Sequence, residues 1–214
     1  MTLSRRPWLL GAAAAVASVA APGWLTPALA QTTPSAPPVR RPTPGQTEGP
    51  FYPVRLPDDH DGDLLRSGHR RYDRGQAVWL DGVVTDLDGR PVQDAVVEIW
   101  QCDHAGHYHH PGDGNRADPA FQGFGRVSVG RDGRYRFRTL RPAPYSGRTP
   151  HIHVKVRLDR LELLTTQLYV AGDPGNERDF LWRRLDEAGR AALTVPFTPG
   201  VDGLRAHFPI TVQI

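Results

Sequence analysis

Two histidines separated by one residue form the most informative pattern in the chain. In residues 151–158, the side chains of His151, His153, Lys155 and Arg157 alternate with four aliphatic residues. This alternation predicts a β-strand whose successive side chains point to opposite faces, so both imidazoles leave the same face. Their Cα atoms are then roughly 6.5–7 Å apart, close enough to bind one zinc, copper or iron ion. The pattern indicates a metal site, although isolated pairs of this kind also occur without a metal.

Two tyrosines and an arginine add to this pattern. Tyr145 lies six residues before His151, in a Pro-rich loop that can return its phenol toward the strand, and Arg148 places a cation nearby. Tyr108 lies in the His-rich loop 102–110; on its own, such a tyrosine is most simply a half-buried loop residue. An alternative therefore stays open, in which the histidines of that loop and the His-x-His pair together bind zinc or copper.

Seven short segments predict strands, and together they favour a β-sandwich or barrel-like core. They alternate with period two or are rich in β-branched residues, with turn residues between them. They are residues 77–84, 95–101, 134–138, 151–158, 165–170, 191–197 and 207–214. We expect one helix over about residues 177–188, capped by Asn176 and ended by Gly189. The predicted class is all-β: a β-sandwich of short mixed or antiparallel strands with long active-site loops and one short C-terminal helix.

The composition excludes several classes of protein. With 214 residues, 39% of them hydrophobic, the chain is long enough for one domain with a sizeable core. Its single cysteine, Cys102, rules out a disulfide scaffold and a cysteine-based zinc site. The net charge is +3, but the 26 basic residues are scattered among 23 acidic ones and form no run longer than two. We therefore expect no nucleic-acid partner.

Residues 1–30 have the three parts of an export signal. Arg5 and Arg6 precede a short apolar run, and the small-residue motif Ala28-Leu29-Ala30 follows it. The apolar run is too short for a spanning helix, which needs about 20 residues. The arginine pair, followed by an aromatic residue, favours a twin-arginine signal over an ordinary secretory one.

Residues 31–46 hold five prolines and almost no apolar side chains. Such a segment predicts an extended linker, because it cannot bury a core. We expect the folded domain to occupy residues 47–214. After cleavage of the signal we expect a periplasmic or secreted protein with no stable membrane span.

Seven motifs occur in an order that resembles a known family. They lie at residues 47–53, 97–101, 106–108, 121–126, 137–142, 151–153 and 166–169. Together they resemble the intradiol ring-cleavage dioxygenases, non-haem ferric enzymes that include protocatechuate 3,4-dioxygenase and catechol 1,2-dioxygenase. The resemblance implies that Fe(III) and O₂ are used to cleave a catechol-type ring between its two hydroxyl-bearing carbons. The product would be a cis,cis-muconate-type diacid.

The resemblance also implies roles for individual residues. The iron ligands would be Tyr108, Tyr145, His151 and His153. Two phenolates are hard anionic donors that favour Fe(III). Tyr145 would leave the metal and accept a catechol proton, Arg148 would stabilise negative charge on the ring, and Gln167 would support the ligands from beside the site. Gly49 and Pro50 match a segment that shapes the substrate pocket.

Two departures from the family pattern leave the substrate open. Tyr145 and His151 are only six residues apart, so we expect the loop that covers the pocket to be short and the site to be more open. We also expect no helical dimerisation domain of the kind found in catechol 1,2-dioxygenases. Catechol, protocatechuate, hydroxyquinol and lignin-derived phenols are all candidate substrates, and a homo-oligomer is compatible with the sequence. The alternative is a non-catalytic exported β-sandwich protein that binds a metal or a phenol.

Overall fold

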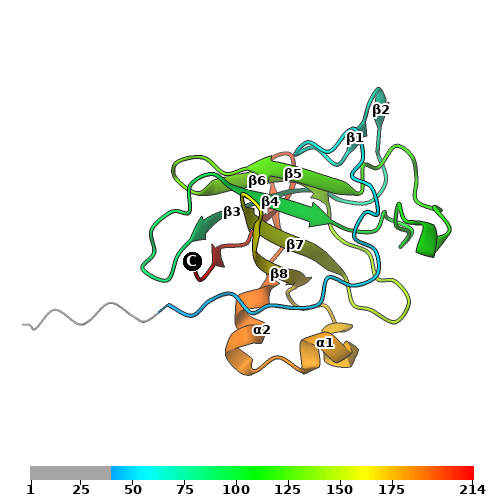
Figure 1. Ribbon diagram of the computed structural model, residues 1–214. Helices are drawn as coiled ribbons and strands as arrows, with labels where there is room; N and C mark the ends of the chain where they lie inside the picture. Colours follow the sequence, from blue (N-terminus) through cyan, green and yellow to red (C-terminus); the bar gives the residue numbers. More distant parts are fainter. Residues whose placement is uncertain (1–39) are drawn as a thin grey trace, which may run out of the picture. The chain divides into compact units, whose positions relative to one another are not determined.

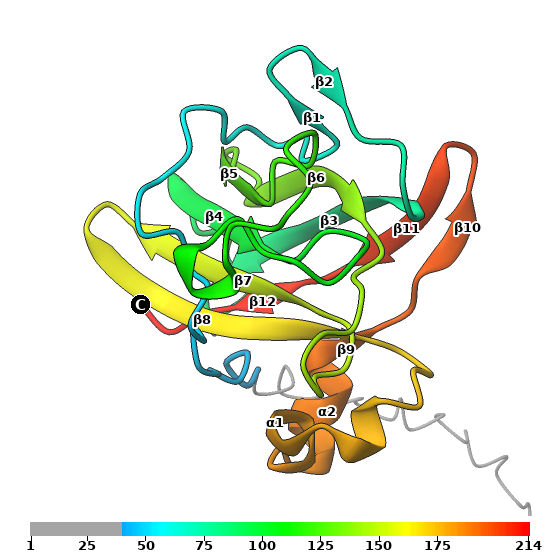
Figure 2. The ribbon, with the colours of Figure 1, turned by 90° about the vertical axis from the view of Figure 1, so that its right-hand side faces the viewer.

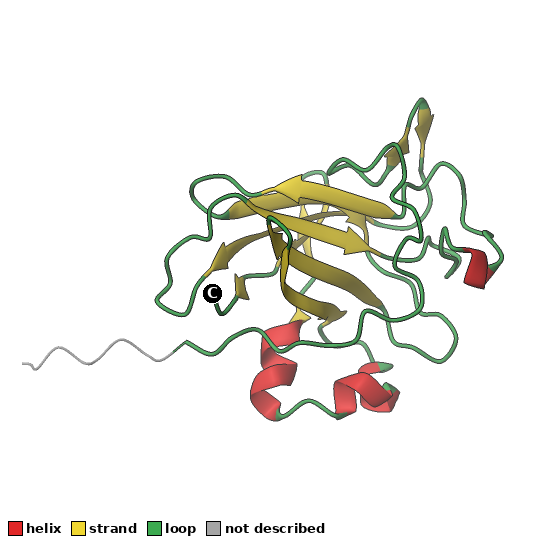
Figure 3. Cartoon of the chain, viewed as in Figure 1, coloured by secondary structure: helices red, strands yellow, loops and turns green. Residues whose placement is uncertain are grey.

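The computed structural model describes residues 40–214, a part of the chain in which strands and loops dominate (Figure 3). The strands form two five-stranded sheets and a separate two-stranded hairpin made of β1 (Arg66–Ser67) and β2 (Arg70–Arg71). The predicted signal at residues 1–30 lies outside the described residues. Within residues 40–214, no helix has the length and apolar character needed to cross a membrane.

The first five-stranded sheet is built around one long central strand, β3. Its members are β3 (Ala77–Thr85), β6 (Arg134–Leu140), β10 (Thr198–Gly200), β11 (Gly203–His207) and β12 (Ile210–Thr211). β11 and β12 pair with β3 in parallel, whereas β6 pairs with it antiparallel. The sheet is therefore mixed.

The second sheet has the order β5-β4-β7-β8-β9 and carries the His-x-His pair on its central strand. Its members are β4 (Ala95–Trp100), β5 (Phe124–Ser128), β7 (His151–Leu158), β8 (Leu161–Val170) and β9 (Thr194–Val195). Because β7 is hydrogen-bonded to β4 on one side and to β8 on the other, its backbone is held firmly in place.

The two sheets share one hydrophobic core, which makes the fold a β-sandwich. Leu80 of β3 and Phe137 of β6 belong to the same buried cluster as Ile152 and Val154 of β7. Each fully buried aliphatic or aromatic side chain of this kind contributes about 1.5–3 kcal/mol. The predicted class, an all-β sandwich of mixed strands, is confirmed.

The predicted single helix is wrong, because the chain forms three short helical segments instead. They are a 3-10 turn at Asn176–Arg178, α1 (Phe180–Arg183) and α2 (Glu187–Leu193), the last beside β8 and β9 (Figure 1, Figure 2). Asp179 and Asp186 have extended backbones, and their carboxylates cap α1 and α2. Aspartate side chains compete with helical backbone bonds and so interrupt the helix. Asn176 and Gly189 consequently lie inside helical segments and do not cap or end one.

Two of the predicted C-terminal strands are also wrong in their limits. Residues 191–193 belong to α2, and the strand that follows is only β9. The predicted strand over residues 207–214 is split: β11 ends at His207 and β12 begins at Ile210. Pro209, which lies between them, cannot donate a ladder hydrogen bond. β5 and β10 were not predicted, since glycine, proline and charged residues obscure their alternation.

Packing begins before Thr47, so the expected boundary at residue 47 needs correction. Thr43 is buried, and its backbone N–H donates to the carbonyl of Thr211 at 2.8 Å. The backbone N–H of Gln46 donates to the carbonyl of Thr165 at 2.8 Å. Because β9 pairs only with the last two residues of β8, the rest of that β8 edge is free to bind this segment. Composition cannot show such partners, which are backbone groups far away in the chain.

Candidate active site

Strand β7 presents His151 and His153 on the face opposite the core, and both side chains are buried. Nδ1 of His151 donates to the carbonyl of Thr149 at 2.6 Å. Because a carbonyl only accepts, Nδ1 carries the proton and Nε2 keeps a free lone pair. That Nε2 lies 3.2 Å from Nε2 of His153. The two rings therefore converge on one point.

Both imidazoles are neutral. Burial, together with the charge of Arg148, lowers the pKa of His151 to about 3. Burial also lowers the pKa of His153 well below its ordinary value, with His151 and Arg148 adding to the effect. Neutral imidazole is the form that binds a metal ion.

A tight turn brings the phenol of Tyr145 to the histidines. Ser146 and Gly147 have φ angles of 40° and 77°, and the N–H of Arg148 donates to the carbonyl of Tyr145 at 2.7 Å. Two successive left-handed residues reverse the chain in the manner of a type I′ turn. The Tyr145 hydroxyl consequently donates to Nε2 of His151 at 3.3 Å.

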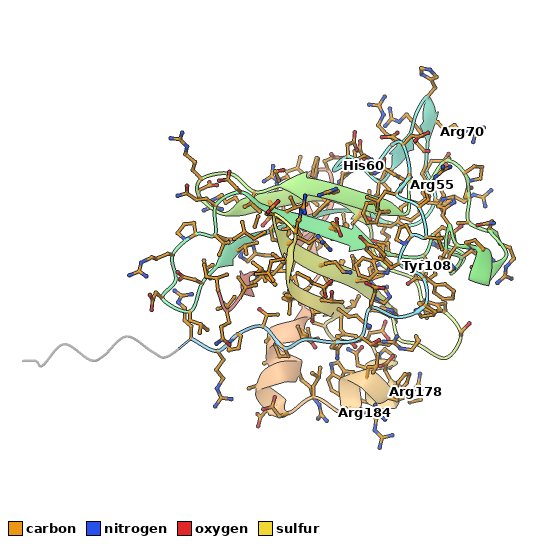
Figure 4. All side chains as sticks on the ribbon, in the orientation of Figure 1. Arg55, His60, Arg70, Tyr108, Arg178 and Arg184 are labelled. Carbon is orange, nitrogen blue, oxygen red and sulfur yellow. The ribbon has the colours of Figure 1, made fainter. Side chains whose placement is uncertain are left out.

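The second tyrosine, Tyr108, lies on the loop beyond the end of β4 (Figure 4). Oδ1 of Asp103 accepts the backbone N–H groups of Ala105 and His107 and so shapes this loop. Gly106 has a φ of 84°, and a Cβ there would lie 3.0 Å from the carbonyl oxygen of Pro144. The two tyrosine loops thus pack closely, and the rings of Tyr108 and Tyr145 meet edge-on with centroids 5.0 Å apart.

The donor groups fit a ferric ion. The Tyr108 hydroxyl is buried and has no hydrogen-bond partner among the described residues, which costs about 1–3 kcal/mol unless another group binds it. Burial raises the pKa of Tyr108 well above that of an ordinary tyrosine, and it raises the pKa of Tyr145 as well. Both phenols therefore remain protonated until a strong cation stabilises the phenolates. Two phenolate oxygens and two imidazole nitrogens are hard enough donors for Fe(III).

Arg148 is held beside the candidate ligands by two short hydrogen bonds. Its Nε donates to Asp179 and its Nη2 donates to the side-chain oxygen of Gln167, both at 2.7 Å. Gln167 is fully buried, and its amide nitrogen donates to the carbonyl of Thr47 at 3.0 Å. The structure therefore brings Arg148 and Gln167 together, and Gln167 is the β8 partner of His153.

Asp179 is a candidate site residue that the sequence did not reveal. One of its carboxylate oxygens accepts the N–H groups of Leu181 and Trp182, and the other accepts Arg148 Nε and the N–H of Thr149. It thus caps α1 and orients the arginine at once. An aspartate before an apolar helical start was a readable cap signal, but the ion pair across 31 residues was not.

The N-terminal segment contacts the site through Gly49 and Phe51. Gly49 has a φ of 75°, and a Cβ there would lie 3.2 Å from Cε1 of His153. The ring of Phe51 stacks on Tyr108 with centroids 4.6 Å apart and meets Tyr145 edge-on at 5.9 Å. Pro50, which the sequence also singled out, is exposed between them. Phe51 was not among the predicted site residues, although it lies in the same motif.

Two cavities flank these rings. Tyr108 lines one of about 370 Å³, whose walls include Phe51, Trp100, Phe121 and Phe124. Tyr145 and Arg148 line the other, of about 470 Å³. Both volumes lie within the range of small-molecule sites.

Two histidines of the loop that carries Tyr108 bond to backbone groups and not to the His-x-His pair. The ring nitrogen of His109 bonds to the carbonyl of Phe121 at 2.6 Å, and His110 accepts the N–H of Gly112 at 3.0 Å. Within residues 40–214, no three His, Cys, Asp or Glu side chains gather in a way that could hold a metal. The zinc or copper alternative therefore finds no geometric support. Burial raises the pKa of Cys102 to about 12, which suits a packing role.

Comparison with known proteins agrees with this geometry. A family model described as dioxygenase matches residues 47–195. Hydroxyquinol 1,2-dioxygenase of Corynebacterium glutamicum is 32% identical over 181 residues, which cover 72% of this chain and 56% of that protein. The chain belongs to the intradiol ring-cleavage dioxygenase family. This intradiol dioxygenase sequence is also 35% identical to catechol 1,2-dioxygenase 1 of Acinetobacter lwoffii over 174 residues, 73% of this chain and 53% of that one.

The chain spans about half the length of the curated intradiol dioxygenases it matches. Among solved structures, it is similar to the dioxygenase domain of a dioxygenase and carbohydrate-binding protein fusion from Streptomyces sp. SirexAA-E. The TM-score is 0.65 at 30% identity, with 81% of this chain and 99% of that chain covered. The shared part is therefore the β-sandwich that carries the site.

Proposed function

We propose that the described unit, residues 40–214, acts as an Fe(III)-dependent dioxygenase that cleaves a catechol-type ring between its two hydroxyl-bearing carbons. The observation that carries this proposal is the convergence of Tyr145 with His151 and His153 beside the unpaired, buried hydroxyl of Tyr108. These four side chains would hold the iron, which makes a bound catecholate reactive toward O₂ when it is present.

The two tyrosines have different surroundings and hence different roles. Tyr108 is 2% exposed, whereas Tyr145 is partly exposed on a turn whose central residues face solvent. Tyr145 therefore has room to move, and its oxygen accepts the proton of a substrate hydroxyl. Tyr108, packed under Phe51, keeps its place.

Arg148 acts on the substrate ring, and Gln167 helps to hold Arg148 in position. The guanidinium is held by Asp179 and Gln167, so its charge is fixed before substrate arrives. A fixed cation stabilises negative charge that develops on the ring without the cost of reorienting. The side chain of Phe51 covers the tyrosines and limits the access of water.

Oxygen uptake with a panel of phenols tests the activity. The full chain, supplied with ferric iron, is mixed with catechol, protocatechuate, hydroxyquinol and a lignin-derived catechol, and the products are identified. We expect O₂ consumption with at least one of them and a muconate-type diacid as product. A semialdehyde would mean cleavage outside the diol and would overturn the proposal. Tight phenol binding without O₂ uptake would favour the non-catalytic binding protein.

The metal and its ligands are tested by colour and by one substitution. Tyrosinate bound to Fe(III) absorbs visible light, so the iron-loaded protein should be coloured; a colourless iron-replete protein contradicts the ligand set. Tyr145→Phe should retain iron and lower kcat by about 10²–10⁴-fold, the usual effect of losing a general base. Full ring cleavage by this variant would contradict the role of Tyr145.

We also propose that the protein is exported through its N-terminal twin-arginine-type signal, residues 1–30. The support is the pair Arg5 and Arg6 ahead of a short apolar run. Changing both arginines to lysine should leave the uncleaved chain in the cytoplasm, as cell fractionation would show. Unchanged export of that variant would indicate an ordinary secretory signal.

A further inference from the structure

Residues 43–53 cross from the edge of the second sheet onto the face that carries the site; we call them the entry strap. Thr166 Oγ1 donates to the carbonyl of Pro44 at 2.7 Å, and the N–H of Gln46 donates to Thr165. Farther along, the strap brings Gly49 against His153 and Phe51 against Tyr108. The part that contacts the site is thus the part beyond the backbone anchors.

The register of β7 places a lysine next to the site on the same face. His153 pairs with Trp100 on β4 and with Gln167 on β8. Two residues on, Lys155 occupies the neighbouring row, between Glu98 and Thr165. Lys155 is the only lysine of the chain, and its side chain is just 5% exposed. Buried ammonium groups require partners, so its contacts are informative.

Lys155 binds the entry strap on both sides of its site-contacting residues. The ammonium pairs with Glu48, immediately before Gly49, and lies 4.2 Å from the centroid of the Tyr52 ring, immediately after Phe51. It also pairs with Glu162 of β8 at 3.1 Å. The Lys155 ammonium therefore contacts the residues on either side of the three-residue segment 49–51.

That segment has few other attachments. Gly49 has no side chain, Pro50 is exposed, and Phe51 is held by ring contacts with Tyr108, Tyr145 and His110. Charge balance for a buried acid does not explain the lysine. The carboxylate of Glu98 already accepts the Tyr52 hydroxyl at 2.9 Å and lies 3.5 Å from Arg126.

We propose that Lys155 is a positioning residue that clamps residues 48–52 over the candidate active site. It sets the position of Gly49 and Phe51 against the side chains of His153 and Tyr108, and so shapes the place where a phenol binds. The effect on catalysis rests on the proposed function, whereas the effect on the strap does not.

Hydrogen exchange of the iron-free full chain tests the clamp itself. In Lys155→Met and Glu48→Gln, amides of residues 45–53 should exchange on the order of tenfold faster. Both variants lose the ion pair, and Lys155→Met loses the cation–π contact with Tyr52 as well. Glu162→Gln is the matched control, since it removes the other partner of Lys155 and leaves the strap contact intact. Exchange in that control should stay within about twofold of the unchanged chain.

Steady-state kinetics with iron-loaded protein then separates positioning from general damage. We expect KM for the preferred catechol to rise on the order of tenfold in Lys155→Met and Glu48→Gln while kcat changes less than about threefold. Lys155→Arg, which keeps the charge, should recover most of the loss. If Lys155→Met does not fold, Glu48→Gln decides, because that side chain is 44% exposed.

Unchanged exchange at residues 45–53 in both variants would overturn the clamp, as would an equal effect from Glu162→Gln. A clamp effect on exchange in a protein that shows no O₂ uptake would leave the inference standing and refute the proposed dioxygenase. Normal ring cleavage together with unchanged exchange at residues 45–53 would refute the clamp and support the proposed dioxygenase.

Discussion

The hydroxyl of Tyr108 is a buried donor that meets no acceptor among the described residues. Tyr135, on β6, is buried to a similar degree, yet its hydroxyl donates to the carbonyl of Phe208 at 2.6 Å. Two tyrosines in one sandwich thus differ in whether the hydroxyl is satisfied by protein. A folded protein can carry the free-energy cost of an unsatisfied buried group at a site where that group is needed for binding.

Removing the hydroxyl of Tyr108 and removing that of Tyr135 should therefore have different effects on the free energy of unfolding. In the iron-free protein, Tyr108→Phe should leave the free energy of unfolding unchanged or raise it by up to about 1 kcal/mol, because no hydrogen bond is lost. Tyr135→Phe should lower it by about 1–3 kcal/mol, because the Phe208 carbonyl loses its partner. Urea denaturation measures both, and iron affinity should fall only in Tyr108→Phe. A larger loss of stability in Tyr108→Phe than in Tyr135→Phe would contradict this explanation.

Gly49 combines a left-handed backbone with close contact to the site. Gly49→Ala should cost about 1–2 kcal/mol for the backbone and, in addition, push on the His153 ring. Gly68→Ala is the matched control, since Gly68 has a φ of 57° and a Cβ there would meet no described atom within 4 Å. Both variants should lose similar stability, but only Gly49→Ala should change iron affinity and the visible spectrum. Identical spectra in the two variants would argue against the contact.

At the scale of the element, the positions of the loops around β7 are set by single side chains that cap a helix and bind a neighbouring loop. Asp179 caps α1 and binds Arg148 with the same carboxylate, so a helix start and a candidate catalytic residue share one anchor. Burial by itself raises the pKa of Asp179, but the hydrogen bonds from Arg148 and the backbone outweigh it and hold the pKa below its ordinary value.

This shift predicts how stability depends on pH. A carboxyl with a lowered folded-state pKa contributes its stability above the unfolded-state pKa of about 3.9, and loses it as the pH falls through the folded-state value. Asp179→Asn should cost about 3–5 kcal/mol near pH 7, since it leaves the charge of Arg148 without its partner. The difference from the unchanged chain should narrow below about pH 4. Denaturation curves at pH 7 and pH 3 provide the measurement.

Asp186→Asn is the matched control for this prediction. Asp186 caps α2 through the N–H of Gly189 at 2.7 Å, whereas the carboxylate that binds Arg148 is that of Asp179. Asparagine caps helices about as well as aspartate, so this variant should lose only a few tenths of a kcal/mol. A cost equal to that of Asp179→Asn would mean that helix capping, and not the arginine pair, explains the effect.

At the scale of the whole described unit, the N-terminal segment is hydrogen-bonded to both sheets. Thr43 exchanges hydrogen bonds with Thr211 of β12 in the first sheet, and Gln46 bonds to β8 of the second. Residues 43–46 are therefore part of the fold, although their composition is that of a linker.

Truncation tests this assignment. A chain that starts at residue 47 should be less stable than one that starts at residue 40 by about 2–4 kcal/mol. The longer chain keeps several buried hydrogen bonds, each of which contributes about 0.5–1.5 kcal/mol. Thermal or urea denaturation of the two chains measures the difference. Equal stability would restore the boundary at Thr47.

The sequence by itself determined the sandwich class and the strand that carries the histidines. The alternation in residues 151–158 sets both faces of β7, because side chains of a strand project with period two whatever their neighbours are. The ordered motifs added the family and the four candidate ligands. These signals are local or are repeated in relatives, so they can be read without coordinates.

Only the tertiary structure decided which distant groups meet. The pair of Arg148 with Asp179, the ring contact of Phe51 with Tyr108, and the clamp of Lys155 on Glu48 join residues 31, 57 and 107 positions apart. No periodicity links such residues, because their approach depends on sheet register and on the paths of loops. The same reason explains why the helix break at Asp179 was not predicted. Its carboxylate binds the start of α1 and also Arg148, which lies on another loop.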